Sequence, residues 1–216
     1  SAGDYTTIVL DANGCEISLS FTISEPELLE ASVSVTDALC NGGSGSSELT
    51  ITGGTAPYTT ENLSDLSAGD YTTTVTDSNG CVTSVSFTIS EPDALETSVS
   101  VTNALCNGGL GSAELTVTGG TAPYDVEELS ALSAGDYTTT VTDSNGCVTS
   151  VSFTITEPDE LSAFVTVTNV SCNGLNDGSA ELTISGGTAP YDMEELSALS
   201  AGDYTTIVLD ANGCEI

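Results

Sequence analysis

The sequence predicts an all-β chain, built of small modules repeated in tandem in an extended linear array. Three observations support this fold class. A block of sequence recurs about every 66 residues, polar and apolar residues alternate within it, and Asn-Gly pairs separate the alternating stretches. A long fixed period is typical of repeat arrays, alternation is typical of β-strands, and Asn-Gly is typical of the turn between two antiparallel strands.

The repeat is marked by the phrase SAGDY and, further along, by Glu-Pro. SAGDY begins at Ser1, Ser67, Ser133 and Ser200, and Glu-Pro recurs at 25–26, 91–92 and 157–158. Cutting after each Glu-Pro predicts four parts: a partial repeat 1–26 with only the C-terminal hairpin strands, full repeats 27–92 and 93–158, and a partial repeat 159–216 that lacks its last strand. Terminal repeats of a capped array are atypical in sequence, and these are not, so we expect the chain to be a segment of a longer array.

Within one repeat, three stretches predict strands. Residues 97–103 and 113–120 alternate with period two, and 136–155 reads as two strands around Asn145-Gly146. This pair predicts a type I′ turn, in which both central residues have positive φ. Proline cannot donate to a ladder and so ends the last strand. The equivalent structural residues are the glycines Gly80, Gly146 and Gly213 and the prolines Pro92 and Pro158.

A tyrosine begins the next-to-last strand of each repeat and follows the phrase Leu-Ser-Ala-Gly-Asp. This is the position of the tyrosine corner in immunoglobulin-like β-sandwiches, where the hydroxyl bonds to backbone a few residues upstream. The alternative is a ring that only packs at the end of the sheet. The candidate corner residues are Tyr71, Tyr137 and Tyr204.

Every charged side chain is acidic. The 216 residues contain 32 Asp and Glu, no Lys, Arg or His, and a formal charge of −32. This composition excludes the usual phosphate-neutralising contacts to nucleic acid and disfavours docking on anionic membranes. No run approaches the roughly 20 apolar residues of a membrane-spanning helix. No basic segment marks a signal peptide at the start, so a targeting segment for secretion would lie outside this stretch.

The residue types also argue against an enzyme. No His is present as a general base, no Lys as a Schiff base, and any Cys nucleophile lacks a basic partner. We therefore expect no catalytic residues and no cofactor. The alternative is structural calcium, held by oxygens of 173–179 or of the 157–160 joint, although the chain has no EF-hand pattern.

Taken together, the motifs GGTAPY, LSAGDY, VTDSNGC and the trailing Glu-Pro resemble the SprB-type repeat of Bacteroidota gliding adhesins and other giant cell-surface proteins. The resemblance covers essentially the whole chain. It implies tandem immunoglobulin-like modules on a long secreted surface filament exported by the type IX system. One departure is a short middle, as in 125–132, which reduces the expected strands of each module from seven to five.

Seven cysteines recur with the repeat, which indicates an oxidising compartment and a disulfide framework. A strand of this length spans roughly 20–30 Å, whereas bridged Cα atoms lie within about 7 Å. Cysteines at opposite ends of one module are therefore too far apart, and bridges between neighbouring modules are favoured. The favoured pairs are Cys40–Cys147 and Cys106–Cys214, with the partners of Cys15, Cys81 and Cys172 outside this segment. The alternatives are bridges within a repeat (Cys40–Cys81, Cys106–Cys147, Cys172–Cys214) or a Cys81–Cys106 bridge.

These observations predict an extracellular, structural stalk or filament segment, stiffened by disulfides between neighbouring β-modules. Its expected partners are further copies of the same repeat, in a longer chain or a fibre. The alternative function is a ligand-binding adhesive module for surface polysaccharide or one that depends on calcium.

Overall fold

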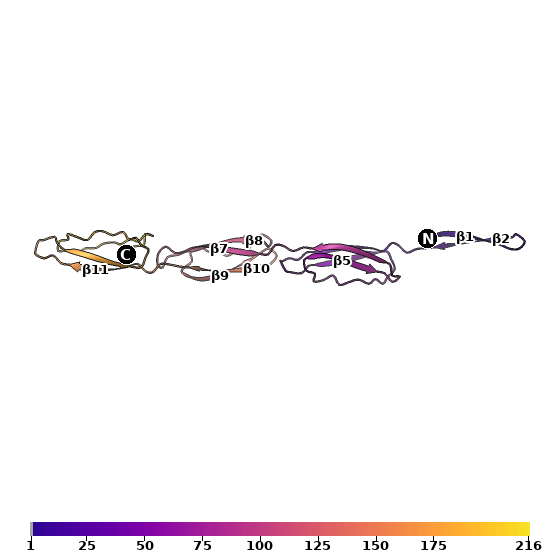
Figure 1. The fold of residues 1–216 in the computed structure, drawn as a ribbon, viewed down its shortest axis with the longest axis horizontal. Helices are drawn as coiled ribbons and strands as arrows, with labels where there is room; N and C mark the ends of the chain where they lie inside the picture. The colour runs from indigo at the N-terminus through magenta and orange to yellow at the C-terminus, as the bar shows by residue number, and fades with distance from the viewer. Residues whose placement is uncertain (1) are drawn as a thin grey trace. The chain divides into compact units, whose positions relative to one another are not determined.

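The computed structural model describes residues 2–216, which form β-strands and connecting turns and no helix. The all-β prediction is confirmed. The chain divides into two compact units, Ser1–Asp93 and Ala94–Ile216, and Figure 1 labels several of their strands. Within 2–216 the strands are β1 (Gly3–Leu10), β2 (Glu16–Ile23), β3 (Glu30–Thr36), β4 (Ser46–Thr52), β5 (Gly69–Thr76), β6 (Val82–Ile89), β7 (Glu96–Thr102), β8 (Ser112–Thr118), β9 (Gly135–Thr142), β10 (Val148–Ile155), β11 (Ser162–Thr168) and β12 (Ser179–Ser185).

The strands pair antiparallel, each with its neighbour in sequence, into two-stranded sheets. In the repeat 93–158, β7 pairs with β8 and β9 pairs with β10. Figure 1 shows these two pairs as two layers, and β7 lies beside β10. The predicted strands are confirmed, because β7, β8 and the β9–β10 pair occupy the alternating stretches. Their inward side chains are half-buried or buried and their outward ones exposed.

The connection between the two pairs holds no continuous strand. Asp125 bridges Thr142 at the end of β9, and Leu132 bridges Gly111 just before β8. Within 94–158 the described chain therefore has four strands and two isolated bridges, where five strands were predicted. The segment crosses from one pair to the other: Asp125 bonds to Thr142 at one end, and Leu129 and Leu132 bond to Ala113 and Gly111 at the other.

The preceding repeat has the same plan, with β3–β4 and β5–β6 pairs and β3 beside β6. The interior of both repeats is small, which is the expected limit for modules of this size. Among the described residues, the buried apolar side chains of these two repeats are Leu29, Ala38, Val75, Ile89, Ala104, Val141, Phe153 and Ile155, and those of 159–216 are Leu161 and Val208.

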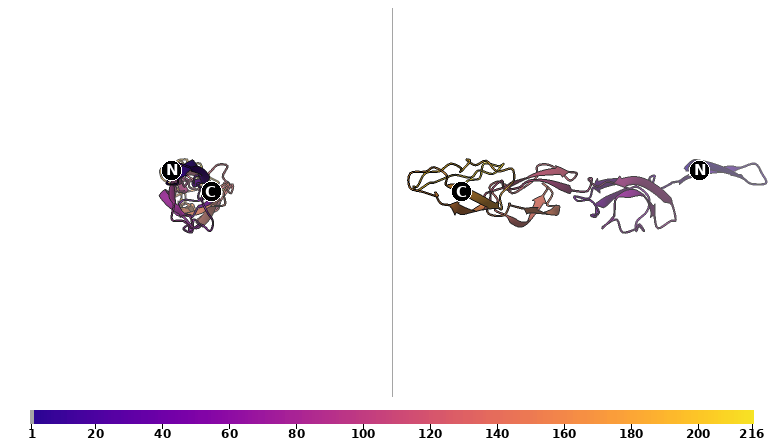
Figure 2. Two further views of the ribbon diagram at one scale, coloured as in Figure 1. Left: turned by 90° about the vertical axis from the view of Figure 1, so that its right-hand side faces the viewer. Right: turned by 60° about the vertical axis from the view of Figure 1, so that its left-hand side comes forward.

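The two partial repeats differ from the full ones. Every described residue of β1 and β2 is exposed, and Figure 2 draws them as a hairpin. At the other end β11 pairs with β12, but 201–216 contains only the isolated bridges of Leu209 to Asp192 and to Glu215. The fourfold division by repeat remains a prediction. The described residues include no helix long and apolar enough to cross a bilayer.

Candidate functional site: the cysteine joint and its turns

The turn that carries the second cysteine of each repeat is organised by an aspartate. In the last copy, Asp210 Oδ1 accepts the backbone N–H of Asn212 at 2.8 Å and of Cys214 at 2.9 Å. Its other oxygen accepts the N–H of Thr188, from the Gly-Gly-Thr turn, at 2.8 Å. The carboxylate thereby fixes the cysteine-bearing turn and ties it to a second loop. Asp77 and Asp143 make the equivalent contacts in the two full repeats.

These aspartates are buried, and Asp210 is only 5% exposed. Burial raises the pKa of the Asp210 carboxyl, but the N–H donors of Cys214, Thr188 and Asn212 together outweigh burial. They hold the pKa below its usual value, because hydrogen bonds to a carboxylate favour its charged form. The group is thus a structural anion rather than a proton donor near neutral pH.

Sequence reasoning missed these aspartates. The signal was present, because Asp-x-Asn-Gly-Cys recurs with fixed spacing at 11–15, 77–81, 143–147 and 210–214. An Asp that accepts the N–H two residues later is a known local turn motif. The repeated Asp would have identified the residue that holds each cysteine in place.

The predicted type I′ geometry at Asn145-Gly146 is wrong. Gly146 has φ of 85°, but Asn145 is not among the described non-glycine residues with positive φ. The loop instead spans five residues, closed by Asp143 N–H to Cys147 O at 2.9 Å and Gly146 N–H to Asp143 O at 3.0 Å. The aspartate carboxylate overrides the Asn-Gly preference. Only the glycine, like Gly80 and Gly213, needs the left-handed conformation.

A disulfide joins the cysteines of two consecutive repeats. Cys106 and Cys214 are bonded at an S–S distance of 2.00 Å, with Cα atoms 5.7 Å apart. Beside the bond, Asn212 Nδ2 donates to Leu105 O at 2.9 Å and to Thr188 Oγ1 at 3.0 Å. This cluster, called here the Cys106–Cys214 joint, therefore combines a covalent link with a hydrogen bond between repeats 93–158 and 159–216. It corresponds to the favoured pairing between modules and differs from the alternatives within a repeat.

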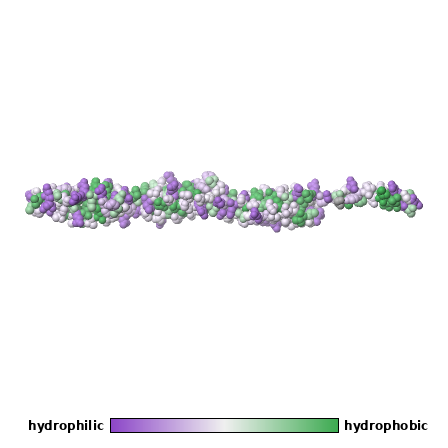
Figure 3. All heavy atoms as spheres, turned by 45° about the horizontal axis from the view of Figure 1, so that its top comes forward, coloured by the Kyte–Doolittle hydropathy of each residue, from purple (hydrophilic) through white to green (hydrophobic). Residues whose placement is uncertain are grey.

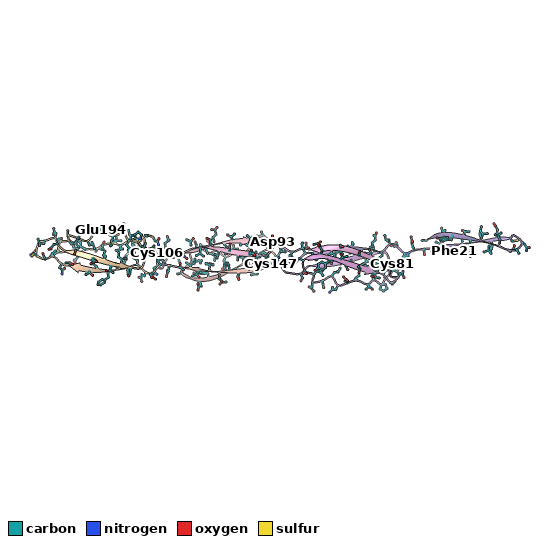
Figure 4. All side chains as sticks on the ribbon, in the orientation of Figure 1. Phe21, Cys81, Asp93, Cys106, Cys147 and Glu194 are labelled. Carbon is teal, nitrogen blue, oxygen red and sulfur yellow. A yellow bond between two sulfur atoms is a disulfide. The ribbon has the colours of Figure 1, made fainter. Side chains whose placement is uncertain are left out.

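The other cysteines fall into two groups. Cys40 and Cys147 are also disulfide-bonded. Cys15, Cys81 and Cys172 are free and exposed. Figure 4 labels Cys81, Cys106 and Cys147 on their turns.

The Glu-Pro motif positions the other side of the joint, the Cys-Asn-Gly loop. Asn107 Nδ2 donates to Pro158 O at 3.1 Å, and Gly108 N–H donates to Glu157 Oε2 at 2.7 Å. The end of the repeat therefore holds the loop that carries Cys106. The same contacts recur in the preceding repeat between Asn41 and Pro92 and between Gly42 and Glu91.

The tyrosine of SAGDY bonds back to the connection that precedes it. Tyr137 Oη donates to Ser133 O at 2.9 Å, and the ring stacks on Phe153 across the sheet at 5.5 Å between centroids. This is the link expected of a tyrosine corner. Tyr71 and Tyr204 make the same bond to Ser67 O and Ser200 O, at 2.9 and 3.0 Å.

The tyrosines of the Ala-Pro-Tyr motifs are also used within the fold. Tyr124 Oη donates to Gly119 O at 2.7 Å, and Tyr58 and Tyr191 make the equivalent bonds to Gly53 and Gly186. The Ala-Pro bond before each of these tyrosines is cis.

The segments suggested for calcium have internal partners in the structure. Asp177 accepts the N–H and the hydroxyl of Ser171, at 3.0 and 2.6 Å, and Glu157 accepts from Gly108. Among residues 2–216 no group of three or more acidic or Cys side chains is arranged to hold a metal ion. Calcium binding remains an untested alternative.

Comparison with known families gives one result. The profile of the SprB repeat matches this chain at residues 32–59, 98–125 and 165–192. Each match begins in the first strand of a repeat and extends to its Ala-Pro-Tyr motif. Searches of curated proteins and of solved structures each gave no significant match.

Proposed function

Because the chain carries SprB repeats at three positions, we propose that it is a structural segment of a long cell-surface adhesin. In this proposal the repeats are immunoglobulin-like β-sandwich modules in a linear array, and disulfides between neighbours limit their movement. The segment acts as a stalk or filament that holds another part of the protein away from the cell.

The observation that carries the proposal is the Cys106–Cys214 joint. A disulfide within one module stabilises only that module, whereas this bond connects two consecutive repeats. The hydrogen bond from Asn212 to Leu105 fixes a second point between them. Two points of attachment restrict rotation of one module against the next, which is the mechanical requirement of a stalk.

The packing supports the immunoglobulin-like assignment. Two strand pairs enclose Val141 and Ile155, both almost fully buried. The Tyr137 hydroxyl bonds to the connection before its strand, as a tyrosine corner does. The polar outward faces are the expected exterior of such a module.

We propose that Cys40 and Cys147 pair in the same way as Cys106 and Cys214. Both are disulfide-bonded, and they occupy the equivalent positions one repeat earlier. By the same rule, Cys172, which lies in a Cys-Asn-Gly loop like Cys106, takes its partner from a following repeat. Cys15 and Cys81, which lie in Asp-x-Asn-Gly-Cys turns like Cys214, take their partners from preceding repeats. These partners lie beyond residues 1–216.

The roles of the tyrosines favour a structural function over a polysaccharide-binding one. A site for surface polysaccharide is expected to present a patch of several exposed aromatic rings, and each repeat offers one tyrosine in its Ala-Pro-Tyr motif. The hydroxyl of that tyrosine is bonded to a backbone carbonyl of the same repeat, so it has a structural role within the fold. The SprB repeat is a non-enzymatic repeat, in agreement with the absence of His and Lys from the sequence.

Small-angle scattering of the oxidised chain tests the stalk proposal. Cys106→Ser removes the joint and is expected to broaden the distribution of particle dimensions. Cys172→Ser, which removes the equivalent but unpaired cysteine, is the matched control and is expected to leave the distribution unchanged. Equal scattering from the chain and both variants would argue against a stiffening role.

A further inference from the structure

Two strands of the second full repeat lie side by side and run in the same direction. β7 lies beside β10, and just beyond their C-terminal ends Ala104 N–H donates to Thr156 O at 3.0 Å. Close to their N-terminal ends, the side chains of Leu95 and Asp143 both approach Gly120, where an added Cβ would lie 2.9 Å from each. The two strands therefore begin together at one end of the repeat and finish together at the other.

Each of these strands has a chain connection at one end and a cysteine at the other. β7 is entered from the preceding repeat by the chain itself and leads to Cys106, which is bonded to Cys214 of the following repeat. β10 begins directly after Cys147, a disulfide-bonded residue whose proposed partner is Cys40 of the preceding repeat. The chain then continues through Pro158 into β11 of the following repeat. Both strands are thus joined covalently in the two directions of the array.

The cysteine spacings divide the sequence into short and long segments. A short segment runs from the cysteine of an Asp-x-Asn-Gly-Cys turn to the next cysteine, which lies in a Cys-Asn-Gly loop. Its cysteines are 25 positions apart in 15–40, 81–106 and 147–172. The long segment, from a loop cysteine to the next turn cysteine, covers 41, 41 and 42 positions in 40–81, 106–147 and 172–214. The variation in length therefore falls in the long segment, and the short one is constant.

We propose that tension along the array passes through the short segments, here 81–106 and 147–172, and bypasses 107–146. This rests on the proposed function and on the pairing of Cys40 with Cys147. Each repeat is then crossed by two tensed strands, its first and its last, each covalently joined to both neighbours. Segment 107–146 connects the same two joints by a longer route, so it stays slack while the shorter route is taut.

The tensed strands have little length to yield. A β-strand rises about 3.3 Å per residue, and a fully extended chain spans at most about 3.6 Å per residue. β7 and β10 are therefore close to their maximum length in the folded repeat. A repeat without the bypass would instead lengthen by roughly 200 Å when its chain, one period of 66 residues, unfolds. The disulfides thus let the array keep its length even when the interior of a repeat opens.

Segment 107–146 has a different role, because it holds the tensed strands in place. It contains β8, which pairs with β7, and β9, which pairs with β10. It also supplies Val141, which is 0% exposed. The outward residues of β7 and β10 are mainly Ser and Thr, and Figure 3 shows polar residues spread over the outside of this repeat. Strand pairing and burial on the inward side, rather than tension, therefore account for this segment.

Optical-tweezers measurements of the full chain test the proposed path. One DNA handle is attached to the free thiol of Cys81, and the other is joined after the last residue; Cys15→Ser and Cys172→Ser remove the other free thiols. The shortest covalent route between the handles then runs along 81–106 and across the Cys106–Cys214 bond. The oxidised chain is expected to extend at high force to about 27 residues, or roughly 90 Å. Reduction is expected to release the whole distance of about 135 residues, or roughly 460 Å.

Matched insertions distinguish the two kinds of segment. About twelve Gly and Ser residues, which form a flexible chain, are inserted after Glu128 in the long segment or after Asp93 in the short one, both exposed positions. In the oxidised chain the insertion after Asp93 is expected to lengthen the tether by roughly 40 Å, and the insertion after Glu128 is expected to leave it unchanged. After reduction both are expected to add roughly 40 Å. An oxidised tether that lengthens with the Glu128 insertion would overturn the proposal.

The scattering comparison proposed above separates this inference from the proposed function. If Cys106→Ser leaves the scattering unchanged while the tether results are as expected, the bond transmits tension without stiffening the chain, and only the proposed function fails. If the scattering broadens as expected while the Glu128 insertion lengthens the oxidised tether, the tension path alone fails.

Discussion

The same seventeen residues occur twice in this chain, and the two copies differ in everything except their turn. In 1–17 they form strand β1, paired with β2 and exposed throughout. In 200–216 they form no continuous strand, yet Val208 is 2% exposed where its equivalent Val9 is 58% exposed. The first copy is paired with a neighbouring strand but buries no side chain. The second copy buries Val208 but forms no continuous strand.

The turn is the part that does not change. Asp11 Oδ1 accepts from Asn13 and Cys15 at 2.8 and 2.9 Å, the distances found for Asp210 in the second copy. Its geometry is therefore local to Asp-x-Asn-Gly-Cys. Strand pairing depends instead on the eight residues that follow the turn, which form β2 in the first copy. Burial of side chains depends on the strands that come earlier in the repeat.

The largest expected difference between the copies comes from their cysteines. Cys214→Ser removes the joint and is expected to lower the free energy of unfolding of unit 94–216 by about 2–4 kcal/mol. Cys15→Ser is the identical change in the exposed copy and is expected to cost about 0.5 kcal/mol or less. Denaturant unfolding of both variants measures the difference, and equal losses would show that the second copy gains nothing from its bond.

The next difference is in packing. Val208→Ala is expected to cost about 2 kcal/mol, since it removes buried methyl groups and leaves a cavity. Val9→Ala, in the exposed copy, is expected to cost about 0.5 kcal/mol or less. Thermal and denaturant unfolding of the two variants measures the loss in the free energy of unfolding. Because the local sequence is the same at both sites, the difference between the two losses reports the effect of burial. A large loss from Val9→Ala would contradict the exposed state of the β1–β2 hairpin.

We expect the stability of the chain to depend on pH through Asp210, which is buried, and not through Asp11, which is exposed. Burial raises and N–H donors lower the pKa of Asp210, with a net decrease from the ordinary value of 3.8. A lowered pKa contributes stability above about pH 4, and that contribution is lost as the pH falls through the lower folded pKa. Asp210→Asn is therefore expected to be less stable than the unmodified chain at pH 7, and the gap is expected to narrow below pH 4.

Asp11→Asn is the control for that experiment. The N–H groups of Cys15 and Asn13 lower the pKa of Asp11 as well, but Asp11 belongs to an exposed hairpin. Its substitution is expected to leave the unfolding of 94–216 unchanged at every pH. A gap for Asp210→Asn that stays constant from pH 7 to pH 3 would contradict the charged form as its source.

The smallest effect is expected at the corner tyrosine. Tyr137→Phe removes the bond to Ser133 O and keeps the ring on Phe153, and is expected to cost about 1 kcal/mol. Tyr124→Phe, which removes the bond to Gly119 O, serves as a comparison of similar size. Denaturant unfolding of the two variants measures whether both hydroxyls contribute to the free energy of unfolding. An unchanged free energy in Tyr137→Phe would mean that Tyr137 stabilises the fold only through the packing of its ring.

Strand positions were the most predictable part of this fold. Alternation in 97–103 located β7 at Glu96–Thr102, because inward and outward faces leave a period of two in the sequence. The middle of the repeat was less predictable. Segment 125–132 contacts the two strand pairs only through isolated bonds at Asp125, Leu129 and Leu132, and such bonds leave no periodic signal.

The disulfide pairing at the Cys106–Cys214 joint could be predicted from the sequence, because it depends on the direction of the strands. The Cys106–Cys214 pair follows from placing the two cysteines of one module at opposite ends. The recurring Asp-x-Asn-Gly-Cys motif could have identified Asp210 as the residue that organises its turn, but the partners of Asp210 and Asn212 in other loops could not be predicted. Asp210 reaches Thr188 and Asn212 reaches Leu105, contacts that cannot be read from the turn alone.

The central claim is that a disulfide connects consecutive repeats, and peptide mapping tests it most directly. The chain has no Lys or Arg, so the monomeric fraction is digested with proteases that cleave at Asp and Glu, without reduction. The account requires a peptide pair that joins Cys106 to Cys214. A pair that joins Cys106 to Cys147, or Cys172 to Cys214, would place the bonds within single repeats and contradict it.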